Sequence, residues 1–414
     1  MPNWQDSIED PENPIGVKAT ETHIEVVQTF EGIEGLRGSW ESWLVHPDAD
    51  IDDYSAEIRS DQLLRPYVIV LRKAGLPEAL AAGAIGPAKV TFMLGPVKSC
   101  NPTVIVLRFV HGGFLGNLSR ENSELFIKQI MGTLRQGDAD VVEIEHLDPE
   151  SHIYSLSRAL PPFLCRDHFP RAQSYWKMAL PTDSKGFSDR FSSKERKNIQ
   201  RSARKLSELG KGELRFRCFN KAQDVEGMIN DVESIARKSW QRHVGVGFVN
   251  NAAAHKRLRL RAEKGMLSTH VLYIGDEPCA FWIGRLKHET FYSGSLGYDP
   301  VYAKYSPGTV LLAKTIEGFC NSGTVRQINF GFGDSWYKLH FGAQPCAQAS
   351  VFLFAPSVRG VALKTMRTLT CITDRLLRGF LERTALLGWV KQMWRRLGVK
   401  KAMAADSEGA SHAV

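Results

Sequence analysis

The chain has 414 residues, of which 43% are hydrophobic and 24% charged, and its formal net charge is +8. This length exceeds what one hydrophobic core usually supports, so we expect two domains. The absence of any run of eighteen apolar residues argues against a spanning helix, and seven dispersed cysteines without a CxxC pair argue against a disulfide framework or a structural zinc site.

The chain begins with residues 1–20, which are rich in Pro, Asp, Glu and Asn and are predicted to be disordered. This segment lacks the basic and apolar regions of a signal peptide, so we expect a cytoplasmic protein. From His23 onward, apolar residues alternate between strand and helix spacing. The first block predicts strands over 23–28, 67–72, 81–95, 104–109 and 141–147, and helices over 33–46 and 123–136.

A second block repeats this order of elements. It predicts strands over 214–219, 269–274, 279–286, 290–296 and 327–330, and helices over 188–209, 225–240, 254–264 and 309–319. Residues 181–186 are typical of a linker between the blocks. The sequence therefore predicts a mixed α/β protein with one domain over 21–180, a second over 181–357, and a helical tail over 358–414.

A proline and a glycine, Pro307 and Gly308, precede the last predicted helix of the second block. Proline fixes φ and glycine permits a close backbone approach, so free N–H groups at this helix N-terminus suit a phosphate or pyrophosphate. A second glycine-bearing strand exit, Gly331–Asp334, follows. Together these features favour an enzyme with a nucleotide cofactor over a bare scaffold.

Several motifs follow one another along the second block: Arg196-Lys197-Asn198-Ile199 with Arg201, Arg204 and Lys205, Trp240 with Gly245 and Gly247, Gly297-Tyr298-Asp299-Pro300, Ser306-Pro307-Gly308, and Gly331-Phe332-Gly333-Asp334 with Tyr337-Lys338. In this order they resemble the cellulose-biosynthesis-type (CelD/BcsL) acetyltransferases of the GNAT superfamily, which are similar to the FemABX aminoacyl transferases with two GNAT-like domains. The resemblance implies two tandem GNAT-like domains. It also implies transfer of an acetyl group from acetyl-CoA to an amine or hydroxyl of a sugar or an envelope or polysaccharide precursor.

The glycine loop departs from the common GNAT signature, because only Gly308 remains and Pro307 precedes it. The donor therefore stays open between acyl-CoA and an aminoacyl-tRNA, and a non-catalytic binding protein of the same fold is a further alternative. The resemblance implies that the donor pyrophosphate is bound by Lys304, Ser306, Gly308, Thr309 and Val310. It also suggests that the loop from His111 to Gly116 is a vestigial cofactor loop of the first domain.

Acetyl transfer needs a base for the acceptor and a proton for the leaving thiolate. Asp334 is the candidate base, although Asp at such a position also caps helices. Tyr337 is the candidate proton donor, and Lys338 is expected to offset negative charge on a substrate.

An acceptor site is suggested by Arg196, Arg201 and Trp240. The alternatives are a solvated charged face for the arginines and a core position for the tryptophan. The twelve histidines show no paired ligand spacing, so no metal site is expected.

The tail carries much of the positive charge. Between Val358 and Lys401 there are eleven Lys or Arg residues against Asp374 and Glu382. Such a basic amphipathic segment either contacts an anionic membrane surface, here the inner face of the membrane, or packs on the body of the enzyme. The small-molecule or glycan acceptor is the expected partner, with no specific nucleic acid.

Overall fold

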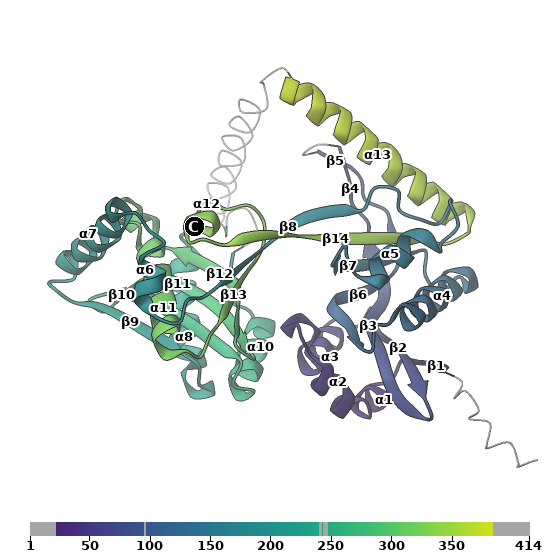
Figure 1. Ribbon diagram of the computed structural model, residues 1–414, viewed down its shortest axis with the longest axis horizontal. Helices are drawn as coiled ribbons and strands as arrows, with labels where there is room; N and C mark the ends of the chain where they lie inside the picture. The colour runs from purple at the N-terminus through teal and green to yellow at the C-terminus, as the bar shows by residue number, and fades with distance from the viewer. Residues whose placement is uncertain (1–21, 95–96, 240–241, 243–246, 384–414) are drawn as a thin grey trace, which may run out of the picture.

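The structure is a computed structural model that describes residues 22–94, 97–239, 242 and 247–383. The predicted disordered segment 1–20 and Trp240 lie outside these residues. One twelve-stranded sheet runs through the molecule, and helices cover both of its faces (Figure 1). The fold is therefore mixed α/β, as the sequence predicts.

The first half of the sheet contains six strands. In spatial order they are β1 (His23–Val27), β2 (Arg65–Lys73), β3 (Leu76–Lys89), β6 (Thr103–Gly116), β7 (Val141–Leu147) and β14 (Gln344–Phe354). Neighbours are antiparallel except β6 and β7, which are parallel. One face carries α4 (Arg120–Gln136) and α5 (His152–Ala159), and the other carries α1 (Phe30–Glu34), α2 (Arg37–Trp43), η1 (Pro47–Ala49) and α3 (Ile51–Ser60).

The second half repeats this pattern in mirror order along the sheet. Its strands are β8 (Arg171–Ala179), β13 (Gln327–Phe332), β12 (Thr290–Tyr298), β11 (Glu277–Lys287), β10 (Leu267–Ile274) and β9 (Leu214–Phe219). Again a single neighbouring pair, β12 and β13, is parallel. Its helical elements are α6 (Ser184–Ser188), α7 (Ser193–Leu209), η2 (Ala222–Asp224), α8 (Val225–Ala236), α10 (Ala252–Glu263), η3 (Pro300–Tyr305), α11 (Pro307–Ser322) and α12 (Trp336–His340).

Strand alternation explains why both faces of each half are covered. In β2, Ile69 and Leu71 pack toward α4, whereas Val68 and Val70 pack toward the α1–α3 side, and all four are fully buried. Successive side chains of a strand point to opposite faces, so a continuous apolar run needs a layer of helices on each side. The same logic places α6, α7 and α11 on one face of the second half and α8 and α10 on the other.

Two strands, β8 and β14, lie in the opposite half of the sheet from the one that the predicted domain boundary gives them. β14 lies within the predicted second domain, 181–357, but pairs with β7 of the first half. β8 lies within the predicted first domain, 21–180, but pairs with β13 of the second half. The two strands also pair with each other, from Gln344↔Lys177 to Ser350↔Arg171. Each half is therefore completed by a strand that the other segment of the chain contributes.

The prediction that residues from His111 to Gly116 form a glycine loop is wrong, because these residues belong to β6, which continues to Gly116. Leu115 and Phe114 pair with Leu80 and Ala81 of β3. The residue that turns the chain toward α4 is Ser119, whose hydroxyl accepts a hydrogen bond of 3.2 Å from the N–H of Asn122.

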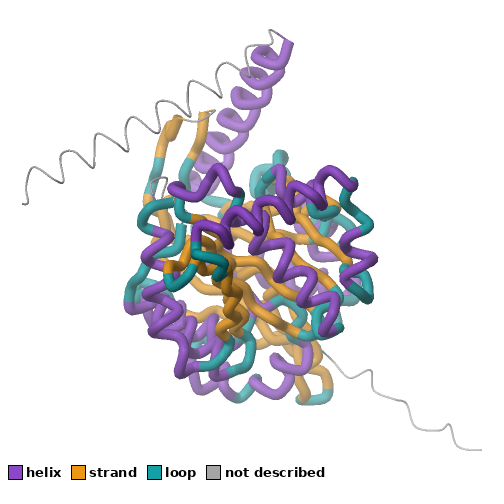
Figure 2. The backbone as a smooth tube through the Cα atoms, turned by 90° about the vertical axis from the view of Figure 1, so that its left-hand side faces the viewer, coloured by secondary structure: helices purple, strands orange, loops and turns teal. Residues whose placement is uncertain are grey.

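The last described helix, α13 (Val358–Arg383), projects from the first half beside the hairpin of β4 (Phe92–Leu94) and β5 (Val97–Cys100), as Figure 2 shows. Its first turns pack on the body, because Leu363 joins a buried cluster with Val104 and Phe354, and Arg367 forms an ion pair of 3.0 Å with Asp167. No helix among the described residues is long and apolar enough to cross a bilayer. Membrane contact through residues 358–401 stays a prediction.

The two halves are also joined by ion pairs between α3 and α10. Lys264 Nζ lies 2.6 Å from Asp50 and 2.7 Å from Asp52, and both nitrogens of the Arg261 fork donate to Asp53 Oδ2 at 2.8–2.9 Å. Asp53 and Arg261 are largely buried, with side-chain exposures of 9% and 17%. Arg285 Nη1 also lies 3.6 Å from Asp53 Oδ2, but the two short hydrogen bonds to this carboxylate come from Arg261, which is therefore its main compensating charge.

We expect Arg261→Met to lower the free energy of unfolding by about 3 kcal/mol, because it leaves the buried Asp53 carboxylate without its two-nitrogen partner. Urea unfolding at neutral pH measures the change. Arg326→Met is the matched control, since its ion pair with Glu289 is exposed and its loss should change the same free energy little. Equal losses of unfolding free energy in the two variants would contradict a stabilising role for the Arg261–Asp53 ion pair.

Candidate active site

The parallel strands of the second half separate toward their carboxyl ends. β12 and β13 pair over three positions, Thr290↔Gln327 to Tyr292↔Asn329. Beyond these, the described residues of β12 pair with β11, and those of β13 pair with β8. Because the two strands are parallel, their carboxyl ends lie at the same edge of the sheet. At this edge, the backbone N–H and C=O groups of β12 and β13 therefore form no hydrogen bonds between the two strands.

The N-terminus of α11 lies at the same edge, directly after β12 and η3. Ser306 has a left-handed backbone (φ 50°), and its side chain makes no capping hydrogen bond. Its carbonyl instead accepts from the N–H groups of Thr309 and Val310, at 3.0 and 3.2 Å. A Cβ on Gly308 would lie 3.5 Å from the ring of Tyr298, so the helix begins close against the end of β12.

The structure thus brings the predicted donor residues together. The side chain of Lys304 is exposed, and its Nζ lies 4.9 Å from the centre of the Tyr305 ring. Val310 is fully buried, and its N–H, like that of Thr309, already donates to the Ser306 carbonyl. The N–H of Gly308 therefore remains as the backbone donor for a ligand at this helix start. A helix N-terminus without a side-chain cap and with an exposed cation nearby is suited to an anionic group.

Asp334 follows β13 at this edge and is exposed. Trp176 Nε1 donates to its Oδ1 at 3.2 Å. The alternative role as a helix cap does not hold, because the N-cap of α12 is Ser335 and no side chain caps that helix. Within the part of the chain that the structure describes, the carboxylate therefore accepts a hydrogen bond at one oxygen only.

Tyr337 packs in the core under α11, with its ring 6.0 Å from that of Phe330. Burial raises its pKa to about 12, so the hydroxyl keeps its proton at neutral pH. It is chemically able to donate that proton.

Lys338 does not have the predicted contact with a substrate. Its side chain is 2% exposed, and its ammonium donates to the carbonyls of Gly331, Phe332 and Gly333 at 3.1, 2.7 and 2.9 Å. Burial lowers its pKa to about 8, while the charge of Asp334 acts in the opposite direction. Lys338 thus fastens the turn that carries Asp334.

The predicted acceptor residues are not gathered at this edge. Arg196 donates to the carbonyls of Ser188 and Phe191 at 3.1 and 2.6 Å, which fixes the start of α7. Arg201 is exposed on α7. No contact between these two arginines and the Asp334 turn is present among the described residues.

A cavity of about 800 Å³ lies beside Asp334 instead. Its wall combines the start of β8 with α13, and it includes Phe169 together with Arg171, Arg367 and Arg375. Arg375 lies 4.5 Å over the Phe169 ring. Arg367 is already paired with Asp167, so Arg171 and Arg375 are the guanidinium groups of this wall that suit an anionic ligand.

A second cavity, of about 420 Å³, lies between the halves and was not predicted from the sequence. It is lined by His46, His111 and His146 together with Tyr175 and Tyr292. Burial, reinforced by His111, lowers the pKa of His46 to about 3 and that of His146 to about 4. The imidazoles of His46 and His146 are therefore neutral at physiological pH.

The carboxylate of Asp48 lies next to the histidines and is paired with Arg285. His111 Nδ1 lies 3.3 Å from Asp48 Oδ2, and Arg285 donates to the other oxygen of Asp48. Burial alone would raise the pKa of Asp48, but the hydrogen bond with His111 and the charge of Arg285 hold it below its ordinary value. The His46-Pro47-Asp48 spacing was the one sequence signal for this cluster.

Glu145 lines the same cavity, and burial together with Glu143 raises its pKa from 4.5 to about 7. A carboxyl whose pKa is raised on folding stabilises the protein below about pH 4.5, and this contribution is lost as the pH rises through about 7. We therefore expect Glu145→Gln to gain stability relative to the wild type between about pH 5 and pH 8. Urea unfolding of both proteins at these two pH values measures the gain, and parallel pH profiles would contradict it.

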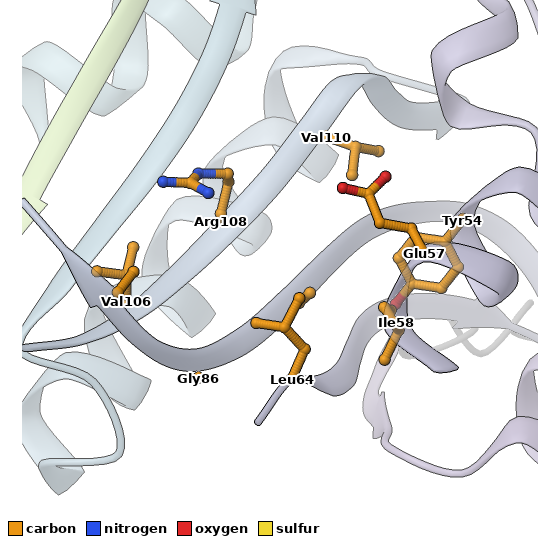
Figure 3. A pocket seen from close by; sticks show the side chains of 10 residues that line it. Tyr54, Glu57, Ile58, Leu64, Gly86, Val106, Arg108 and Val110 are labelled. Carbon is orange, nitrogen blue, oxygen red and sulfur yellow. The ribbon is translucent and has the colours of Figure 1, made fainter. Parts of the chain in front are cut away.

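A third cavity lies on the first half, between α3 and strands β3 and β6 (Figure 3). Glu57 and Arg108 border an otherwise mostly apolar wall that includes Leu64 and Val106. Its volume of about 80 Å³ is far below the several hundred Å³ typical of ligand sites. It is too small for an acyl donor.

Part of the chain is similar to a known protein family. Residues 193–339 match the family model of an acetyltransferase (GNAT) domain. No curated protein gives a significant match. Among solved structures, FemX shares 9% sequence identity, with a TM-score of 0.51 over 80% of this chain and 97% of that chain.

Two further structures align with lower TM-scores. A tandem GNAT protein from the clavulanic acid biosynthesis pathway has 11% identity and a TM-score of 0.45, covering 81% of this chain and 99% of that chain. L-PGS from Bacillus licheniformis has 12% identity and a TM-score of 0.43, covering 78% and 98%. The family match includes the separated strands, the start of α11 and the Asp334 turn, so residues 193–339 are similar to an acetyltransferase (GNAT) domain.

Proposed function

We propose that this protein transfers an acyl group, most simply acetyl, from acyl-CoA to an amine or hydroxyl. The observation that carries the proposal is the coincidence of three features at one edge: the separation of β12 and β13, the uncapped start of α11, and the exposed Asp334. All three lie within the residues that match the GNAT domain.

In this proposal the donor occupies the edge where β12 and β13 separate. The backbone N–H group of Gly308 binds the pyrophosphate, and Lys304 offsets its charge. The acceptor nitrogen or oxygen attacks the thioester carbonyl, and Asp334 takes its proton. The C–S bond then breaks, and Tyr337 protonates the thiolate.

A comparison of the two halves supports the second half as the donor-binding one. β6 and β7 also separate after four paired positions, Val106↔Val141 to Phe109↔Ile144. However, the helix that follows, α4, begins with a capped turn, since Ser119 accepts from Asn122 N–H. The carboxyl edge of the first half carries His111 and His146 in place of an uncapped helix N-terminus.

The acceptor is proposed to be an anionic sugar or an envelope or polysaccharide precursor, consistent with the cellulose-biosynthesis resemblance. The arginine-bearing cavity of about 800 Å³ beside Asp334 supports this class, because guanidinium groups bind phosphate and carboxylate groups in a two-pronged manner.

The second candidate is aminoacyl transfer from a charged tRNA, which the FemX fold similarity favours. Titration calorimetry with acetyl-CoA distinguishes the two donors. Heat of binding, together with thiol release on addition of phosphorylated sugar acceptors, is expected for the first function. Absence of binding at millimolar acetyl-CoA, with binding of aminoacyl-tRNA, would overturn it in favour of the second.

A further inference from the structure

Three side chains at the junction of the halves are arranged like metal ligands. One potential ligand atom of each of His46, Asp48 and His111 lies within 4.8 Å of the others. The Nδ1 atoms of His46 and His111 lie 3.5 and 3.3 Å from Asp48 Oδ2. In a tetrahedral zinc site with bonds of about 2.0–2.1 Å, neighbouring ligand atoms are about 3.3 Å apart. Two of the three edges therefore already have nearly this length.

The backbone holds the three ligands together. His46 and Asp48 flank Pro47 at the start of η1, and His111 comes from β6. Gly112, next to His111, has a φ of 71°, and a Cβ there would lie 2.5 Å from the Cβ of His46. Only a glycine lets β6 approach His46 this closely. The close approach of the two imidazoles, with ring centres 3.9 Å apart, depends on it.

Outer partners orient the ligands. His46 Nε2 lies 3.1 Å from the Tyr175 hydroxyl, so Nδ1 faces Asp48. Nδ1 accepts a hydrogen bond of 3.3 Å from the backbone N–H of Asp48, and a bound metal ion would replace this hydrogen bond. Arg285 donates to Asp48 Oδ1 and, at 3.1 Å, to the carbonyl of Pro47, which leaves Oδ2 facing the histidines. Hydrogen bonds of this kind to the second atom of a ligating group are typical of metal sites.

We propose that His46, Asp48 and His111 bind one divalent transition-metal ion with nitrogen and oxygen preference, of which zinc is the best match. Two imidazoles and one carboxylate suit this ion, and three protein ligands leave a coordination position open. His46 and His111 line the 420 Å³ cavity, so the open position accepts an oxygen or nitrogen atom of a molecule bound there. The site lies outside the residues matched by the GNAT domain and is independent of the proposed acyl transfer.

The test measures metal binding by the full chain and requires no enzymatic activity. Protein stripped with a chelator is dialysed against zinc, and the bound metal is counted; one equivalent per chain is expected. His46→Gln and His111→Gln should weaken the affinity about 100-fold or more. Tyr175→Phe, which keeps the ring but removes the hydroxyl that orients His46, should weaken it about 10-fold. With cobalt, the wild type should show the visible absorption of a low-coordinate N/O site.

His23→Gln is the matched control, because it also removes one histidine but lies exposed on β1. It should bind zinc as the wild type does. Zinc affinity that is unchanged in both ligand variants, or a wild type that binds no zinc, overturns the proposal. If circular dichroism shows that a ligand variant does not fold, the zinc affinity of Tyr175→Phe and the cobalt spectrum of the wild type test the proposal instead. An unchanged zinc affinity in Tyr175→Phe, or an octahedral aqua-type cobalt spectrum of the wild type, would also overturn the proposal.

Discussion

Asp334→Asn is expected to lower the rate of acyl transfer about 100-fold or more, since general-base catalysis contributes at least that factor. The free energy of unfolding should stay within about 0.5 kcal/mol of the wild type, because Asp334 is exposed. Asparagine keeps an Oδ1 that can accept the hydrogen bond from Trp176. Thiol release and urea unfolding measure the two quantities separately.

Asp276→Asn is the control for Asp334→Asn. Asp276 lies between β10 and β11 with a side-chain exposure of 98%, and its ion pair is with Arg215. The same chemical change there should alter neither rate nor stability. A rate for Asp334→Asn that matches this control would show that the carboxylate is not the base, whereas equal losses of rate and stability would assign it a structural role.

Most elements of both halves could be predicted from the sequence, because their apolar spacing is local. β12, for example, was expected over 290–296 and spans Thr290–Tyr298. β8 and β14 were not predicted. They pair with each other and across the halves, so their stabilising contacts come from residues more than a hundred positions away. Local periodicity contains no signal for such an exchange.

For the candidate sites too, features formed by residues adjacent in the sequence could be predicted, and contacts between distant residues could not. The start of α11 could be predicted because Pro307 and Gly308 are adjacent in the sequence, and a helix N-terminus is a local feature. The cluster of His46 and His111 could not, because its members are sixty-five positions apart and meet only when β6 passes η1. Lys338 was misassigned because nothing in its sequence neighbourhood shows that three carbonyls of the preceding turn surround its ammonium.

The start of α11 permits a prediction in which stability and donor binding change in opposite directions. Thr309→Glu places a negative charge in the first turn of the helix, where the helix dipole favours it. The free energy of unfolding should rise by a few tenths to about 1 kcal/mol. The same charge repels a pyrophosphate bound at the neighbouring N–H of Gly308, so the KM for acyl-CoA should rise about 10-fold or more, with kcat little changed.

Ala253→Glu is the control for Thr309→Glu, since it adds the same charge to the exposed first turn of α10. It should stabilise that helix to a similar extent and leave the KM unchanged. Because a destabilised fold cannot explain a KM effect in a protein that has become more stable, the pair of variants separates donor binding from folding. An unchanged KM in Thr309→Glu would place the donor elsewhere than at the start of α11. An equal rise of KM in both variants would reflect only the altered net charge.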